Sequence, residues 1–363
     1  MLHLKDFDYN LPKELIAQRP VKPRDHSRLL ALDKKTGEIK HKHFYDIVDY
    51  LNKGDVLVLN NSKVFPARLI GKKAGIGGKI EVFLLKRIRG ALWQCLLGGH
   101  GGKEGLEVEF GLGLRCEIVK NNNDGTWEAR FNKSGKSLMD TVGRIGYTPL
   151  PPYIKQITNH KSQIPKQAND KINYQTVYAD DKKVGSVAAP TAGFHFTPEL
   201  IKKLKAKGAR IEYITLHVGL GTFAPVKADD ITKHKMHAEW VEVKNSVIKK
   251  VIKAKQEGRR VIAVGTTSVR TLEAAAFQIT NSKLQIPNKL QIQNYKFKTD
   301  IFIYSGYEFK IVDAMITNFH LPKSTLLMLV SAFAGKKNID KAYKIAIKNK
   351  YRFYSYGDAM LIV

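Results

Sequence analysis

An apolar strand, a tight glycine turn and the start of a helix follow one another in Val261-Ile262-Ala263-Val264-Gly265-Thr266-Thr267-Ser268. Four apolar residues bounded by turn residues are typical of a buried strand. From residue 174 onward, helical and strand-like segments alternate around this stretch. Thr197-Pro198-Glu199 predicts the start of one helix, Gly208 predicts its end, and Ala209–His217 is the next strand candidate. We therefore expect an α/β (α+β) main domain.

A different texture interrupts this domain between residues 67 and 131. Six short strand-like segments are joined by glycine-rich turns and contain no helical pattern: Ala67–Ile70, Lys79–Lys86, Ala91–Leu97, Leu106–Phe110, Leu114–Lys120 and Thr126–Phe131. Short strands of this kind predict a small antiparallel β-barrel. We expect a β-barrel domain at residues 67–149, inserted into a discontinuous α/β catalytic domain formed by residues 1–66 and 150–363.

The charge balance suggests a polyanionic partner. The chain has 363 residues, and its 61 Lys and Arg outnumber its 33 Asp and Glu, which gives a formal net charge of +28. Nucleic acid is the usual partner of such a protein, because each neutralised phosphate releases condensed counterions. The alternative is a solvated lysine-rich surface that serves only solubility.

Cysteine usage and hydropathy limit the class of protein. The two cysteines, Cys95 and Cys116, fall in strand-like segments and in no C-x-x-C pair, which argues against a disulfide framework, a zinc ribbon or an iron–sulfur cluster. The N-terminal residues do not have the pattern of a signal peptide, and no apolar stretch reaches the ~20 residues that a bilayer span needs. We expect a soluble, cytoplasmic protein.

Two glycine-containing stretches are candidate ligand sites. The turn at Gly265, Thr266 and Thr267 could present backbone N–H groups to an anion or to ribose hydroxyls; the alternative is an ordinary capped connection between a strand and a helix. Residues 185–196 are mostly small and end in Phe194-His195-Phe196. Small residues let a backbone approach a ligand closely, and aromatic faces suit a base or a sulfonium. The alternative is a tightly packed buried segment.

Further histidines occur in turns. His217 stands where a strand ends in a glycine loop, a common position for active-site residues in α/β sheets. His234 and His237 would share a face if they were helical, which would allow a metal site, but Glu239–Val243 alternates like a strand. His320 follows Asn318 before a helix, and Asp358 precedes the last strand. Each of these residues could instead be a capping or core polar group.

The sequence resembles one family over its whole length. The resemblance is carried by residues 15–20, 24–29, 60–69, 174–179, 185–197, 215–226, 234–239, 264–272, 317–335 and 351–360. These blocks are similar to those of the S-adenosylmethionine:tRNA ribosyltransferase-isomerase family of queuosine biosynthesis. Phe194 stands where the family usually has Leu, and Ser305 where it usually has Pro.

The resemblance implies the substrates and the reaction. The partners would be S-adenosylmethionine, as a consumed co-substrate, and a tRNA that carries 7-aminomethyl-7-deazaguanine at the wobble position. The ribosyl part would be transferred and isomerised to give epoxyqueuosine in the tRNA, with adenine and methionine released. The family needs no metal and no other cofactor. We expect a monomer that does not bind a membrane.

The reaction needs proton transfers near neutral pH, to which histidine is suited. His195, His217, His237 and His320 are the candidates for base and acid, with Asp358 or Glu239 orienting one of them. Binding candidates are Gly265, Thr266 and Thr267 for the methionine carboxylate or the ribose, and Phe194 or Phe196 for adenine. Asn318 is a further substrate-binding candidate, and Lys63 and Arg68 could contact tRNA phosphates. The rival hypotheses are an S-adenosylmethionine-dependent RNA methyltransferase and a non-catalytic RNA-binding protein.

Overall fold

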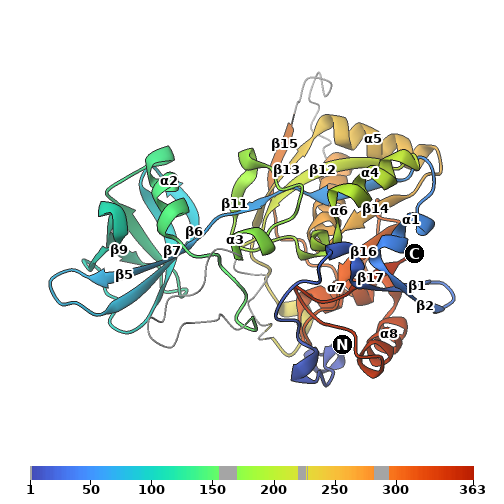
Figure 1. Cartoon of the computed structure of the whole chain (residues 1–363), viewed down its shortest axis with the longest axis horizontal. Helices are drawn as coiled ribbons and strands as arrows, with labels where there is room; N and C mark the ends of the chain where they lie inside the picture. Colours follow the sequence, from blue (N-terminus) through green and yellow to red (C-terminus); the bar gives the residue numbers. More distant parts are fainter. Residues whose placement is uncertain (1, 155–169, 220–225, 227, 282–293) are drawn as a thin grey trace. The chain divides into compact units, whose positions relative to one another are not determined.

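The computed structural model of the chain describes residues 2–154, 170–219, 226, 228–281 and 294–363, with the side chains of 278–281 left out (Figure 1). The chain forms two compact units. The body unit comprises residues 1–63, 175–183 and 189–363, and the barrel unit comprises residues 64–174 and 184–188. The domain boundaries expected from the sequence, 67–149, stay a prediction.

The body unit is built on a nine-stranded mixed sheet (Figure 1). Its strands, in spatial order, are β15 (Asn294–Thr299), β13 (Glu239–Lys244), β12 (Arg210–His217), β3 (Val56–Asn60), β14 (Val261–Val264), β16 (Ala314–Asn318), β17 (Ala359–Ile362), β1 (Arg28–Leu32) and β2 (Ile39–His43). The four central strands, β12, β3, β14 and β16, are parallel to one another. The flanking strands β13 and β17 run antiparallel to their neighbours β12 and β16.

Helices cover the sheet because its central strands are apolar on both faces, as expected of parallel strands. On one face, the core packs around Leu57, Leu59 and Ile316 and includes residues of α1 (Ile47–Tyr50), of α4 (Pro198–Ala206) and of the 3-10 turn η7 (Thr191–His195). The other helices of the body unit are α5 (Asn245–Gln256), α6 (Thr266–Asn281), α7 (Thr325–Ala334) and α8 (Lys336–Lys348). The predicted cap of α4 is confirmed, since the Thr197 hydroxyl accepts a hydrogen bond from Leu200 N at 3.1 Å.

The barrel unit contains a closed six-stranded antiparallel barrel, as predicted. Its strands are β5 (Arg68–Lys73), β6 (Lys79–Arg89), β7 (Leu92–Gly98), β8 (Glu107–Glu109), β9 (Arg115–Asn121) and β10 (Trp127–Phe131), and helix α2 (Gly135–Ile145) follows them. Cys95 and Cys116 are both buried, free thiols. Burial raises the pKa of Cys95 to about 12 and also raises that of Cys116, so both thiols are protonated and unreactive.

Three elements differ from what the sequence pattern indicates. The Lys-, Gln- and Asn-rich composition of residues 281–300 indicates an exposed loop, but Asn294–Thr299 forms the edge strand β15; residues 282–293 lie outside the described ranges. The polar composition of residues 158–171 also indicates a loop, but Lys171 lies in the short helix α3 (Asp170–Asn173); residues 158–169 are not described. The sequence pattern indicates a helix over residues 340–349, but α8 starts four residues earlier, at Lys336, because Gly335 adopts a positive φ of 81° and turns the chain there. Within the described ranges, none of the helices has the length and hydrophobicity of a bilayer span.

A buried carboxylate ties α6 to the segment that leads into β16. Glu273 is 1% exposed. Its Oε1 accepts hydrogen bonds from the backbone N–H groups of Ile311 and Val312, both at 3.0 Å. Its Oε2 accepts one from Lys310 N at 2.8 Å and one from the Tyr307 hydroxyl at 3.2 Å.

We expect Glu273→Ala to lower the free energy of unfolding by about 3 kcal/mol, because it leaves buried backbone donors without an acceptor. Urea unfolding at pH 7.5 measures the loss. The control is Lys310→Ala, which removes only an exposed ion pair with Glu308 and should cost less than about 1 kcal/mol. A loss for Glu273→Ala no larger than that of the control would contradict this role.

Candidate active site

The topology of the body sheet gathers the candidate residues at one edge. Because parallel strands end at the same edge, His217 at the end of β12, Gly265 after β14 and Asn318 at the end of β16 lie along it. Strands β17 and β13 run the opposite way, so Asp358 before β17 and Glu239 at the start of β13 lie there too. We call this the carboxyl edge of the sheet.

The 3-10 turn η7 places His195 against this edge. A Cβ on Gly265 would lie 3.5 Å from Ala192 of this turn, and one on Gly193 would overlap the Tyr178 hydroxyl at 1.9 Å. Only glycine therefore fits at position 193. The close approach brings His195 Nε2 within 3.2 Å of Asn318 Nδ2, and His195 Nδ1 lies 2.7 Å from the Ser27 hydroxyl.

The hydrogen bonds of Asn318 determine the state of His195. Asn318 Oδ1 accepts from the Thr191 hydroxyl at 3.1 Å, and its Nδ2 donates to the carbonyl of Tyr354 at 3.2 Å. The amide nitrogen therefore also donates to His195 Nε2, which leaves the ring proton on Nδ1 to be donated to Ser27. Desolvation, with the Arg352 and Arg24 charges, lowers the pKa of His195 to about 3. This histidine is neutral, and both of its ring nitrogens are engaged.

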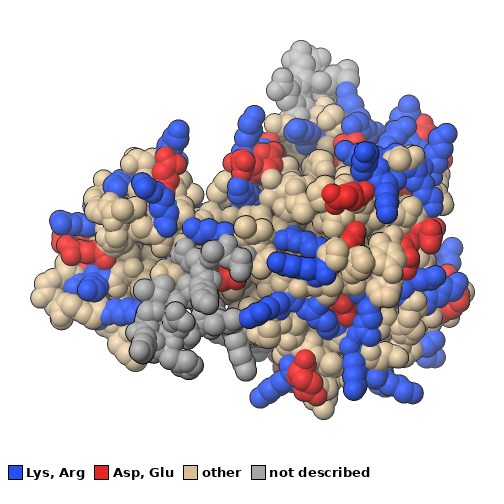
Figure 2. Space-filling model, viewed as in Figure 1, with Lys and Arg blue, Asp and Glu red and all other residues tan. Residues whose placement is uncertain are grey.

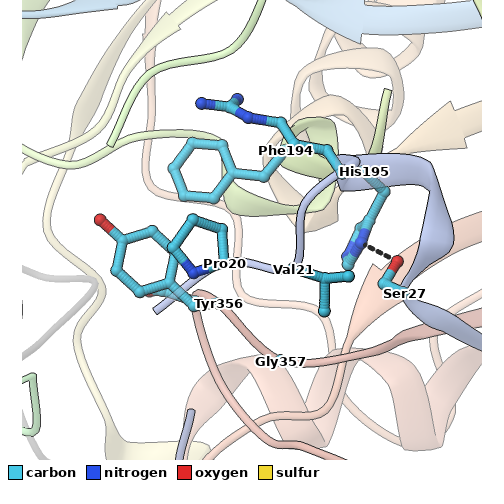
Figure 3. Close-up of a pocket in the computed structure, with 9 residues that line it drawn as sticks. Pro20, Val21, Ser27, Phe194, His195, Tyr356 and Gly357 are labelled. Carbon is cyan, nitrogen blue, oxygen red and sulfur yellow. Dashed lines mark hydrogen bonds between the residues drawn. The ribbon is translucent and has the colours of Figure 1, made fainter. Parts of the chain in front are cut away.

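A small pocket opens beside His195 (Figure 3). The Phe194 and Tyr356 rings stack with centroids 5.8 Å apart, and the Arg24 guanidinium lies 5.5 Å from the centre of the Phe194 ring. Pro20 and Val21 also line the pocket, and Figure 3 shows the His195 ring turned toward Ser27. Flat aromatic faces beside a guanidinium offer a planar heterocycle both stacking and hydrogen-bond donors.

A second cluster surrounds His217. Its ring stacks on Trp240 at 4.9 Å with an angle of 15° between the planes. Desolvation and the Lys183 ammonium lower the pKa of His217 to about 4, partly offset by Glu242, which forms an ion pair with Lys183 at 2.7 Å. His217 Nδ1 is buried, and no described atom hydrogen-bonds to it. His217 therefore has a neutral ring, and one of its nitrogens has no hydrogen-bond partner among the described residues.

Two unpartnered donors lie on the first turns of α6, at the same edge. Thr267 Oγ1 and Arg270 Nη2 are buried and find no hydrogen-bond partner among the described residues. Arg270 is otherwise held by Glu239 and by the Ile301 carbonyl, to which its Nε donates at 3.2 Å. Buried donors of this kind are normally satisfied. A hydroxyl and a guanidinium left open at a helix N-terminus suit an anionic group such as a carboxylate.

The two candidate carboxylates hold arginines and backbone groups. Asp358 accepts from the Arg28 backbone at 3.0 Å, from Arg28 Nε at 3.3 Å and from Arg352 N at 2.8 Å. Its described partners include no histidine. Glu239 pairs with Arg270 and accepts from Gly219 N at 3.0 Å, so it holds the chain just after His217.

The remaining candidates lie apart from these clusters. Phe196 is fully buried between Phe44 and Tyr178 in the core, whereas Phe194, although only 3% exposed, lines the pocket beside His195. The Nε2 atom of His320 lies 2.7 Å from the Thr317 hydroxyl, and desolvation lowers the pKa of His320 to about 3. His237 is exposed in the non-helical segment before β13.

The cations proposed for tRNA binding have acidic neighbours. Lys63 forms an ion pair with Asp181, and Arg68 forms one with Glu81 at 3.3 Å within the barrel unit. A phosphate would have to compete with these carboxylates. In the described ranges, no three His, Cys, Asp or Glu side chains come together as a metal site would require.

The structure adds residues that local sequence patterns do not single out. Arg24, Ser27, Tyr356 and Arg270 contribute to the two clusters, although none of them stands in a catalytic motif. All four fall within the sequence blocks that carry the family resemblance. Their position in those blocks is the feature of the sequence that could have identified them as site residues.

Comparison with known proteins decides the family. A family model described as queuosine biosynthesis protein matches residues 4–362. The chain belongs to this family. It is 50% identical to the S-adenosylmethionine:tRNA ribosyltransferase-isomerase of Acetivibrio thermocellus, with 99% of this chain and 100% of the relative covered. It is also 50% identical to the protein of the same name from Halothermothrix orenii, with both chains covered completely.

A solved structure of the family supports the fold. The crystal structure of S-adenosylmethionine tRNA ribosyltransferase from Thermotoga maritima is 39% identical, covers 99% of this chain and 100% of its own, and aligns with a TM-score of 0.54. The resemblance found from the sequence blocks is therefore confirmed, as is the prediction of a transferase-isomerase enzyme.

The neutral histidines predict how stability depends on pH. The pKa values of His195, His217 and His320 lie near 3 to 4 in the folded protein, against an ordinary value of 6.5. Below pH 6.5 the unfolded chain therefore binds more protons than the folded one. We expect the free energy of unfolding to fall as the pH drops from 6.5 toward 4, by up to about 1.4 kcal/mol per pH unit for each histidine.

Urea unfolding at pH 7.5, 6.5, 5.5 and 5.0 tests this expectation. His320→Gln should reduce the slope below pH 6.5 by about a third. His237→Gln, at an exposed position, is the matched control. A stability that does not change between pH 6.5 and 5.0 would show that these histidines are not held neutral by the fold.

Proposed function

We propose that the chain transfers the ribosyl part of S-adenosylmethionine to 7-aminomethyl-7-deazaguanine at the wobble position of tRNA and isomerises it. The products are epoxyqueuosine in the tRNA, adenine and methionine. S-adenosylmethionine is a consumed co-substrate, and the protein uses no metal or other cofactor. We further propose that it acts in the cytoplasm as a monomer. The names of the full-length relatives support the reaction class.

The observation that carries the proposal is the set of open polar atoms at the carboxyl edge of the sheet. His217 Nδ1, Thr267 Oγ1 and Arg270 Nη2 are buried without a partner among the described residues. Thr267 and Arg270 are suited to the methionine carboxylate. At the same edge, neutral His217 presents an unprotonated nitrogen for the proton of the ribose methylene that the sulfonium acidifies, and its lowered pKa makes it a weak base.

The pocket at Phe194 and Tyr356 is suited to a planar base. Phe194 and Tyr356 are 3% and 4% exposed and stack on each other. Adenine or the deazaguanine would therefore stack here, with the Arg24 guanidinium at the rim, once one of the two rings moves aside. His195 lines the pocket with both nitrogens engaged, so its role is to position Ser27 and Asn318. Lys63 and Arg68 remain candidates for phosphate contacts, in which a tRNA phosphate would replace the carboxylate that each of them now contacts.

Product analysis tests the reaction. The protein is incubated with S-adenosylmethionine labelled in the ribose carbons and with tRNA that carries 7-aminomethyl-7-deazaguanine. We expect equal amounts of free adenine and of ribose label in the RNA. S-adenosylhomocysteine as the product would identify a methyltransferase, and no consumption of S-adenosylmethionine would favour an RNA-binding protein without catalysis.

The role of His217 is tested by substitution. We expect His217→Ala to reduce kcat for adenine release by about 10²- to 10⁴-fold, the usual contribution of a general base. His237→Ala is the matched control and should retain kcat within about twofold, since His237 is exposed and outside both clusters. Parental kcat in His217→Ala would rule out this residue as the base.

A further inference from the structure

Helix α8 carries a continuous row of lysines on its outer face. Lys337, Lys341, Lys344 and Lys348 are exposed, whereas Ile339, Ala342, Tyr343 and Ala346 on the opposite face are buried. The lysines follow one another at intervals of four, three and four residues, so they share one side of the helix. At 1.5 Å per residue the row is about 16 Å long. We call it the α8 lysine face.

The charges of this face are not neutralised by the described residues. The acid on the helix, Asp340, is bound by Lys336 at 2.6 and 2.8 Å. Lys341 donates to the Gly37 carbonyl at 2.8 Å, and no ion pair with a described carboxylate engages Lys337, Lys344 or Lys348. Helix α5 contrasts with this arrangement, because three of its lysines are paired with Glu212, Glu257 and Asp313.

Helix stability does not account for the pattern. Like charges three or four residues apart repel and cost roughly 0.2–0.5 kcal/mol per pair. The helix dipole favours cations near the C-terminus, which suits Lys348, but it disfavours Lys337 in the first turn. On α4, by contrast, Lys203 and Lys205 lie in the last turn, where the dipole favours them. The row on α8 therefore suits an anionic partner.

The α8 lysine face is attached firmly to the candidate active site. Tyr343, on the buried side of α8, accepts a hydrogen bond through its hydroxyl from His320 N at 2.9 Å, two residues after Asn318. The carboxyl end of the helix is held by Arg28, which donates to the Asn349 carbonyl at 2.8 Å and also binds the Lys350 carbonyl and Asp358. A ligand bound along α8 would thus be held in a defined position relative to the carboxyl edge of the sheet.

We propose that the α8 lysine face binds backbone phosphates of the tRNA substrate. The inference rests on the proposed function for the identity of the RNA. Blue side chains project from the lower right of Figure 2, the region where Figure 1 shows α8. A row of mobile ammonium groups neutralises successive phosphates without reading bases, and each contact releases counterions. The face therefore contributes affinity for the tRNA and fixes its position along the protein, while the site at the sheet edge performs the chemistry.

The test removes three of these charges at positions without an ion pair. In the triple variant Lys337→Gln, Lys344→Gln, Lys348→Gln, the equilibrium Kd for modified tRNA is measured between 50 and 200 mM salt. We expect at least about tenfold weaker binding at low salt and a slope of log K against log salt reduced by roughly 3. The KM for tRNA should rise, while kcat at saturating tRNA stays within about twofold.

Two control variants separate this effect from net charge and from misfolding. Lys202→Gln, Lys203→Gln, Lys205→Gln removes the same charge from exposed positions on α4 and should leave the Kd and the salt slope near the parental values. The variant Lys337→Arg, Lys344→Arg, Lys348→Arg keeps the charge and should keep the slope.

Three outcomes would overturn the inference: a parental Kd and salt slope in the α8 glutamine variant, an equal loss in the α4 variant, or a loss confined to binding of phosphatidylserine vesicles. The experiment distinguishes a failure of the tRNA-binding proposal from a failure of the proposed reaction. If the parental protein released no adenine but the α8 variant alone lost tRNA affinity, the proposed reaction would fail and the RNA-binding face would stand.

Discussion

The parallel pairing of β12, β3, β14 and β16 is the constraint on which the site depends. Parallel strands present their carboxyl ends at one edge, so residues that follow strands far apart in the chain become neighbours. The antiparallel strands β13 and β17 add Glu239 and Asp358, which precede or begin their strands, to the same edge. Apolar residues on both faces of the central strands bury this part of the sheet and shield its pairing from water.

Burial gives this edge its chemical character. Carboxylates there hold arginines, as in the pairs of Asp358 with Arg28 and of Glu239 with Arg270, so their charges are compensated inside the protein. His195 and His217 are held neutral mainly by desolvation, with smaller contributions from neighbouring cations. A neutral ring beside open donors is the state that a proton acceptor for a cationic substrate requires. The unpaired positive charge lies elsewhere, on exposed faces such as that of α8, where water and salt limit its cost.

Sequence patterns predicted elements well where the determining contacts are local. The six barrel strands are separated by glycine-rich turns, and α4 is bounded by its Thr197 cap and Gly208, so short-range signals were sufficient. They failed for β15 (Asn294–Thr299), where Tyr295 and Phe297 alternate with lysines but the surrounding Lys-, Gln- and Asn-rich composition indicated a loop. Such a strand is stabilised by its pairing with β13, a contact that the local sequence does not show.

The sequence alone determined the family, the two kinds of domain and the histidines in turns, because these depend on residue types, short spacings and long blocks that resemble one family. Only the tertiary structure decided which candidates act together. His195 meets Ser27, 168 residues away, and Asn318, 123 residues away, and these contacts engage both of its nitrogens. Phe194 lines a pocket while Phe196, two residues later, is buried in the core. Exposure and hydrogen-bond partners arise from contacts between distant segments, so they exist only once the chain has folded.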